Sequence, residues 1–242
     1  MKVAHIVDSS TEVLVSTVVD KTIATISHNW KQGRSAHIVL TGGRTGVQIA
    51  QTLDTEIFRL CNAGEFDAPH VDIWFSDERF TDHADPERTD TKLIAAFEKS
   101  SHIPELTITF HRVGSPRDIS LSGAASAYAQ ELEISLGERR FDSVILSLGE
   151  DGHIASLFPG LATTAHSTKS AVAVDNSPKP PAERVSISVD RLALASAIYI
   201  FALGEGKREA LTTFTQHKVG PVALVQEAAT FGQMVIATDL KI

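Results

Sequence analysis

A histidine that follows two carboxylates and a glycine is the side chain best suited to acid/base chemistry in this sequence. It stands in the segment LGEDGHIASLFPG, residues 148–160, directly after an apolar run at 143–148. A histidine with a carboxylate two residues earlier suits a general base with an orienting partner. We therefore expect His153 to act as a base and Asp151 to support it, with a helix following at 154–158.

A glycine-rich segment, TGGRTG at residues 41–46, lies between an expected strand and an expected helix. Adjacent glycines such as Gly42 and Gly43 let the backbone approach an anion, and the helix behind them supplies N–H groups and a favourable dipole. The spacing fits neither GxGxxG nor GxxxxGK[ST], so nucleotide binding is not supported. We interpret the segment as a phosphate site, with a purely structural tight turn as the alternative.

Two further groups of charged residues are candidates for the site. Asp77, Glu78 and Arg79 come directly after the run at 71–75, and would enter the same crevice as the glycine loop if the two strands are parallel neighbours. A solvated loop is the alternative. Arg184 and Lys207 are the other candidate cations. Lys207 lies in a first helical turn, where a positive charge opposes the helix dipole unless an anion is present.

Strand and helix patterns alternate along the whole chain. This alternation predicts an α/β fold with a doubly wound, mostly parallel sheet and helices on both faces, Rossmann-like, in a single domain over residues 1–242. We interpret the Pro-rich segment 177–184 as a loop within that domain. Helices are expected from about residue 11, after residue 46, and at 91–99, 118–136 and 206–215. Strands are expected at Val3–Val7, Ala36–Leu40, 71–75, 106–110, 143–148, Ala171–Val174, 185–189, Ala197–Ala202 and 234–237.

Composition narrows the function classes. The net charge of -8, without a run of Lys or Arg, argues against nucleic-acid binding. No segment approaches the roughly 18 apolar residues of a membrane span. The single cysteine, together with an N-terminus unlike a signal peptide, predicts a cytoplasmic protein. There is no HExxH motif or Cys/His cluster, so we expect no metal. Oligomeric state stays open, and a monomer is compatible with the sequence.

Taken together, these segments resemble the 6-phosphogluconolactonase family, in the larger group that also holds glucosamine-6-phosphate deaminase and ribose-5-phosphate isomerase. The resemblance covers essentially the whole chain and rests on TGGRTG, SDERF, DPERT, LGEDGHIASLFPG, PPAERVSIS and GEGK, in the family's order. It implies hydrolysis of a phosphorylated sugar lactone, 6-phosphoglucono-δ-lactone, in the oxidative pentose phosphate pathway, without a metal or organic cofactor.

The resemblance also implies roles for individual residues. His153 would activate water with Asp151 beside it, Arg79 would face the lactone, and Asp77 would contact the substrate. The phosphate would be held by Gly42, Gly43, Arg184 and Lys207. The chain departs from the family in its glycine loop, where Arg44 and Gly46 replace the usual Ser and Pro or Leu, and at Thr89, where many members have Asn.

Two competing functions stay open. A glucosamine-6-phosphate deaminase would share the Asp-Gly-His segment, but that family typically reads DEY where this chain has residues 77–79, and FNEPG where this chain has Leu157-Phe158-Pro159-Gly160. A non-catalytic sugar-phosphate sensor would keep the phosphate loop. Such sensors usually carry a DNA-binding segment, and we expect no room for one before the first strand.

Overall fold

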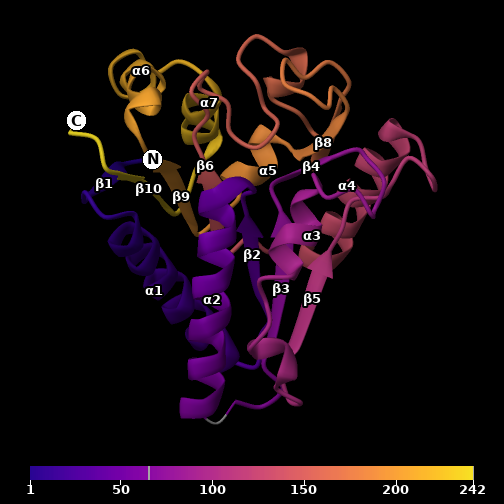
Figure 1. The fold of residues 1–242 in the computed structure, drawn as a ribbon, viewed down its shortest axis with the longest axis vertical. Coiled ribbons are helices and arrows are strands. Elements are labelled where there is room, and N and C mark those ends of the chain that lie inside the picture. The colour runs from indigo at the N-terminus through magenta and orange to yellow at the C-terminus, as the bar shows by residue number, and fades with distance from the viewer. Residues whose placement is uncertain (65, 242) are drawn as a thin grey trace.

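A seven-stranded parallel sheet forms the centre of the protein in the computed structural model, which describes residues 1–64 and 66–241 (Figure 1). The strand order is β1-β10-β9-β6-β2-β3-β5, and every neighbouring pair is parallel. This confirms the predicted α/β fold. The strands are β1 (Val3–Val7), β2 (Ala36–Leu40), β3 (His70–Phe75), β5 (Thr107–His111), β6 (Ser143–Ser147), β9 (Ala197–Ala202) and β10 (Gln233–Thr238).

Helices cover both faces of the sheet, because alternate strand residues point into two separate apolar cores. In β6, Ile145 enters one core, while Val144 and Leu146 enter the other. The first core is closed by α1 (Thr11–Trp30), α2 (Gly43–Ala63) and α3 (Thr89–Ile94). The second is closed by α4 (Leu121–Leu136), α5 (Val189–Ala193), α6 (Arg208–Thr212) and α7 (Pro221–Ala228).

A second, antiparallel sheet lies near the carboxyl ends of the central strands (Figure 1). It has the order β4-β8-β7, formed by β4 (Asp77–Arg79), β8 (Arg184–Ile187) and β7 (Ala171–Val174). Residues 77–79, predicted as part of a polar loop, are therefore a short strand. The strands expected at 171–174 and 185–189 do form, but they pair with each other instead of extending the parallel sheet.

Helix boundaries agree with the sequence pattern except near the functional segments. Ser10 caps α1 as expected, its Oγ accepting a hydrogen bond from the Val13 amide. The helix predicted at 91–99 begins earlier and ends at Ile94, and the one predicted at 206–215 is divided into a 3₁₀ turn (Glu205–Lys207), α6 and a π-helical turn (Thr213–His217). Among the described residues, no helix has the length and apolar character needed to cross a membrane.

Candidate active site

Four adjacent strands deliver the polar segments to one edge of the sheet. β9, β6, β2 and β3 are parallel neighbours, so the loops that follow them start at the same edge. The glycine loop follows β2, Asp77 follows β3, the His153 segment follows β6, and Lys207 follows β9. The condition set in the sequence analysis, that the strands before the glycine loop and before Asp77 are parallel neighbours, is therefore met.

The glycine loop makes a close turn from β2 into α2. Gly43 has a φ of 77°, a conformation that favours glycine, and a Cβ on Gly46 would lie 2.0 Å from the Thr41 carbonyl oxygen. Gly42 occupies the N-cap position of α2 and provides no side-chain cap to the first amides. The turn thus needs glycine for its own geometry, and it also leaves helix N–H groups suited to an anion. The phosphate role stays a prediction.

The His153 segment is a tight loop that needs glycine at two positions. The Gly149 amide donates to the His153 carbonyl at 2.7 Å, and a Cβ on Gly149 would lie 2.0 Å from His153 Nδ1. Gly152 has a φ of 85°. The helix predicted at 154–158 is wrong: Ala155 takes a left-handed φ of 50°, and the segment turns back on itself while burying its apolar side chains.

His153 and Asp151 form a hydrogen-bonded pair. The Nδ1 to Oδ1 distance is 2.5 Å, and the imidazole stacks on Phe158 with ring centroids 4.6 Å apart. Burial lowers the pKa of His153, against the opposing effect of Asp151. Burial alone would raise the pKa of Asp151, but the His153 ring and then Lys179 lower it to about 2. At neutral pH the pair is an ionised carboxylate beside an uncharged imidazole.

Lys179 is the third member of this group, and sequence reasoning did not select it. Its Nζ lies 3.1 Å from Asp151 Oδ2 and 3.4 Å from His153 Nδ1. The ammonium charge lowers the pKa of His153 further, after burial. Only a loop was predicted at 177–184, because Pro-rich composition carries no signal of where a loop folds.

Arg184 is buried, and its guanidinium shapes the Lys179 loop. Nε donates to the Pro181 carbonyl at 3.1 Å, and Nη2 donates to the Lys179 carbonyl at 3.0 Å. Nη1 lies 3.4 Å from Ser156 Oγ, which in turn donates to Asp77 Oδ2 at 2.6 Å. Arg184 and Asp77 therefore belong to the surroundings of His153. A direct contact of either with substrate stays a prediction.

Arg79 lies with the glycine loop in one cavity of about 410 Å³, together with Gly42, Gly43, Arg44 and Lys92. Its Nη1 pairs with Glu87 Oε2 at 2.9 Å. The sequence-based assignment placed Arg79 at the lactone, away from the phosphate. The structure places Arg79 in the glycine-loop cavity, and its role at the lactone stays a prediction. Arg44 and Lys92 are cations of this cavity that the sequence analysis did not include among the site residues.

Glu78 does not enter the crevice with Asp77 and Arg79, so that part of the sequence-based expectation is wrong. Side chains alternate along a strand, and Glu78 in β4 points to the opposite side from its two neighbours. It is fully buried. Oε1 accepts hydrogen bonds from the Arg79 and Thr89 amides at 2.8 Å, and Oε2 accepts one from the Asp90 amide at 2.7 Å. Glu78 thus fixes the backbone on both sides of the loop 80–88.

Glu78→Gln is expected to destabilise the protein by roughly 1–3 kcal/mol at pH 8, because the new NH₂ group cannot accept a bond from these amides. Burial, and next the charge of Asp90, raises the pKa of Glu78 from 4.5 to about 7. Between these two pH values the folded state holds a proton that the unfolded state has lost. The contribution of Glu78 to the free energy of unfolding therefore falls as pH rises from 4.5 to about 7.

Glu78→Gln has no carboxyl group to titrate at this position. The difference in unfolding free energy between the unaltered protein and Glu78→Gln, measured by urea denaturation, should therefore be larger at pH 5 than at pH 8. The exposed Glu105→Gln serves as the matched control. A deficit that grows from pH 5 to pH 8 would show that Glu78 is not held protonated in the folded protein.

Lys207 lies in the turn after β9, which touches the His153 segment. A Cβ on the neighbouring Gly206 would lie 2.7 Å from Glu150 Oε1, so the two loops are in close approach. Within residues 1–64 and 66–241, the Lys207 side chain has no hydrogen bond or ion pair. The turn that carries Lys207 therefore approaches the His153 segment at Glu150, and Lys207 is not among the residues that line the glycine-loop cavity.

The described part of the chain contains no cluster of three or more His, Cys, Asp or Glu side chains arranged to hold a metal ion. The arrangement that does exist is an imidazole–carboxylate pair, a nearby lysine and several arginines around one sheet edge. Such a group can remove a proton from water and stabilise negative charge.

Comparison with known proteins places the chain in a family. Residues 9–236 match the family described as glucosamine-6-phosphate isomerases/6-phosphogluconolactonase. The chain is 34% identical over 184 residues to a 6-phosphogluconolactonase of Streptomyces coelicolor, covering 73% of this chain and 69% of that protein. It is 29% identical to a 6-phosphogluconolactonase of Mycobacterium tuberculosis, covering 83% and 81%.

The fold is shared with a solved structure described as 6-phosphogluconolactonase from Trypanosoma cruzi, with a TM-score of 0.80 at 23% identity, covering 98% of this chain and 94% of that one. The family match spans the glycine loop, the strand-end carboxylates, the His153 segment and Lys207. The protein therefore belongs to the glucosamine-6-phosphate isomerase/6-phosphogluconolactonase family.

Proposed function

We propose that the protein is a 6-phosphogluconolactonase that hydrolyses 6-phosphoglucono-δ-lactone to 6-phosphogluconate in the pentose phosphate pathway, with His153 as the base. The observation that carries the mechanism is the His153–Asp151 pair at the carboxyl end of β6, next to a glycine loop and several cations. The lactonase activity of the S. coelicolor and M. tuberculosis relatives supports this choice of reaction within the family.

The pair fixes which nitrogen of His153 can act as a base. Asp151, with its pKa lowered to about 2, is ionised and can only accept hydrogen bonds. The 2.5 Å contact therefore assigns a proton to Nδ1, which leaves Nε2 with a lone pair. In this proposal, Nε2 takes a proton from the attacking water, and Asp151 stabilises the imidazolium that forms.

The remaining steps need charge stabilisation and one proton transfer. The water oxygen bonds to the lactone carbonyl carbon, and the carbonyl oxygen becomes an oxyanion that a nearby cation stabilises. When the intermediate collapses, the bond from this carbon to the ring oxygen breaks. The imidazolium of His153 is then the proton donor for the ring oxygen, which restores the neutral base without a covalent intermediate.

The non-reacting phosphate is assigned to the amides of Gly42 and Gly43 with the surrounding cations. Arg79 and Arg184 are direct cross-strand partners in the β4–β8 pair. Like charges in that position repel each other, and an anion between them would relieve the repulsion. We therefore place Arg79 with the phosphate. Lys207 does not line the glycine-loop cavity, so we propose that its side chain extends from the β9 loop to the phosphate when the substrate is bound.

Timed hydrolysis of freshly generated 6-phosphoglucono-δ-lactone, measured above the spontaneous background, tests the proposed activity. The deaminase alternative predicts ammonia release from glucosamine 6-phosphate instead. Ammonia release without lactone hydrolysis would overturn the proposal.

We also propose that the protein is located in the cytoplasm, as the sequence predicts.

Lys179→Gln is expected to move the acidic limb of the kcat/KM profile to higher pH. The positive charge of Lys179 helps to lower the pKa of His153, after burial, so its loss should make His153 easier to protonate. Because kcat/KM falls where the free enzyme's base becomes protonated, the midpoint of that limb follows the pKa of His153. Lys169→Gln, at an exposed position, is the control. An unmoved limb would mean that His153 is not the titrating base or does not sense Lys179.

A further inference from the structure

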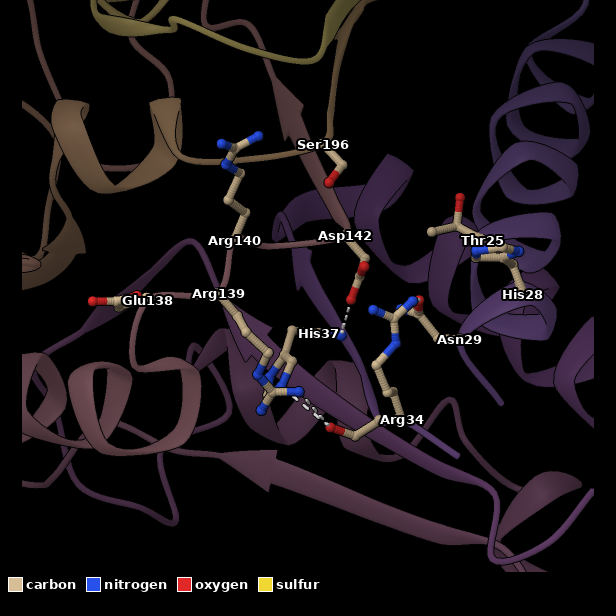
Figure 2. A pocket seen from close by; sticks show the side chains of 11 residues that line it. Thr25, His28, Asn29, Arg34, His37, Glu138, Arg139, Arg140, Asp142 and Ser196 are labelled. Carbon is tan, nitrogen blue, oxygen red and sulfur yellow. Dashed lines mark hydrogen bonds between the residues drawn. The ribbon is translucent and has the colours of Figure 1, made fainter. Parts of the chain in front are cut away.

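A polar pocket of about 500 Å³ is shown in Figure 2. It lies at the amino ends of the parallel strands, which is the edge of the sheet opposite to the candidate active site. Its walls come from the amino-terminal starts of β2, β6 and β9, which are adjacent strands, and from the end of α1. These strands have five or six residues, so the pocket and the His153 edge are separated by roughly 15–20 Å of sheet. We call it the amino-edge pocket.

Three arginines, Arg34, Arg139 and Arg140, line the amino-edge pocket of a protein whose net charge is -8. Two of them have only neutral hydrogen-bond partners among the described residues. Arg34 Nη2 donates to Asn29 Oδ1 at 3.3 Å, and Arg139 Nη2 donates to the Ser135 carbonyl at 2.8 Å. Guanidinium groups without a carboxylate partner keep donors available for an added anion.

Arg140 follows the same pattern. Its guanidinium carbon lies 3.8 Å from the centroid of the Phe231 ring, and that ring is more than half exposed. Stacking on an aromatic ring holds the guanidinium plane without using its N–H donors. All three arginines are exposed enough to reach a small ligand in the pocket.

The lack of an ion pair distinguishes these three arginines from most other arginines of the protein. In the described part of the chain, most other arginines pair with a carboxylate within 4.0 Å: Arg59, Arg79, Arg88, Arg112, Arg117 and Arg208. The arginines without such a partner gather at two places. Arg44 and Arg184 belong to the candidate active site, and Arg191 adjoins Arg139, its Nη2 3.5 Å from the Arg139 carbonyl.

The two carboxylates of the pocket, Glu138 and Asp142, offset only part of the charge of the three arginines. Asp142 Oδ2 accepts a bond from the His37 amide at 2.8 Å; burial raises the pKa of Asp142, while that hydrogen bond and the charges of Arg139 and Arg34 act to lower it. Glu138 points away from the centre of the pocket, whereas Arg34, Arg139 and Arg140 are arranged around Asp142 (Figure 2). The hydroxyls of Ser35 and Ser196 add small polar groups to the wall.

We propose that the amino-edge pocket is a second anion site, which binds the phosphate of a small phosphorylated metabolite through Arg34 and Arg139. Arginine forks suit phosphate because they donate two parallel hydrogen bonds. The volume of about 500 Å³ is that of a pocket for a small molecule, and the concave shape favours such a ligand over an extended acidic protein surface. The site is independent of the lactonase assignment.

Inorganic pyrophosphate is the first probe, titrated calorimetrically at low ionic strength into the full chain. Because a charge-assisted hydrogen bond is worth more than a neutral one, Arg34→Gln and Arg139→Gln should each weaken binding by about tenfold or more. The matched control is Arg59→Gln, which removes an exposed arginine paired with Glu56 on α2. Ribose 5-phosphate and adenosine 5′-diphosphate then distinguish a sugar phosphate from a nucleotide as the source of the phosphate.

Thermal unfolding without ligand should be unchanged in the two variants, which separates lost binding from a damaged fold. Lys207→Ala should leave pyrophosphate binding at the amino-edge pocket intact. If Lys207→Ala abolishes pyrophosphate binding while Arg34→Gln and Arg139→Gln leave it unchanged, the anion binds at the candidate active site. That result would overturn the proposal. Binding of poly-glutamate without binding of pyrophosphate would also overturn it and indicate an acidic macromolecule.

Discussion

Replacing His153 with asparagine is expected to lower kcat on 6-phosphoglucono-δ-lactone by about 10²- to 10⁴-fold, the usual contribution of a general base. Asparagine is smaller than the imidazole, and its amide NH₂ can still donate to Asp151, so the loop should keep its fold. It has no basic nitrogen at the position of Nε2. The change therefore removes proton transfer while leaving the charges that bind the substrate.

The measurement is steady-state hydrolysis corrected for the spontaneous reaction, together with the affinity for the product 6-phosphogluconate. Product affinity should change little, because the cations of the site are intact. The acidic limb of the pH profile should also disappear with the base. Near-normal turnover in this variant would remove His153 from the mechanism, and equal losses in turnover and product affinity would indicate a damaged site instead of a lost base.

The arrangement of the motifs could be predicted because it follows from strand order alone. Motifs that follow parallel strands must share one edge of the sheet, whatever the details of the loops. The run at 143–148 is apolar on both sides, as a strand between two cores requires, and the structure places it at the centre of the sheet. This is why the His153 segment could be placed without any knowledge of its contacts.

The position of Glu78 could not be predicted, because three charged residues in a row resemble a solvated loop. Once residues 77–79 are known to form a strand, the alternation of side chains separates Glu78 from Asp77 and Arg79. The pairing of β4 with β8 produces that strand, and it joins segments about a hundred residues apart in sequence. Local pattern carries no information about such a partner.

The loop after His153 and the loop of Lys179 show the same limit. The apolar residues 154–158 suggested a helix, but the left-handed Ala155 makes a turn whose side chains are buried by tertiary packing. The Lys179 loop is held by Arg184 through backbone carbonyls, so its fold depends on the last residue of the Pro-rich segment, which is anchored in β8 of the antiparallel sheet. In both places, tertiary contacts decide the backbone.

Lys207→Ala is expected to lower kcat/KM on the phosphorylated lactone by about 10- to 150-fold, since a charge-assisted hydrogen bond contributes roughly 1.5 to 3 kcal/mol. Binding energy at a remote phosphate can orient the reacting carbon, so kcat should fall as well as affinity. In the structure, the Lys207 side chain makes no hydrogen bond or ion pair to any described residue, so removing it breaks no contact within that part of the fold.

Unphosphorylated glucono-δ-lactone separates this role from general damage. On that substrate Lys207→Ala should cost little, because the ammonium has no phosphate to bind, whereas a disturbed fold would depress both reactions alike. Lys21→Ala, an exposed lysine on α1, controls for the loss of one positive charge and should affect neither substrate. An equal loss on the two lactones would reject the phosphate assignment of Lys207 and leave it as a solvated residue at the start of a helix.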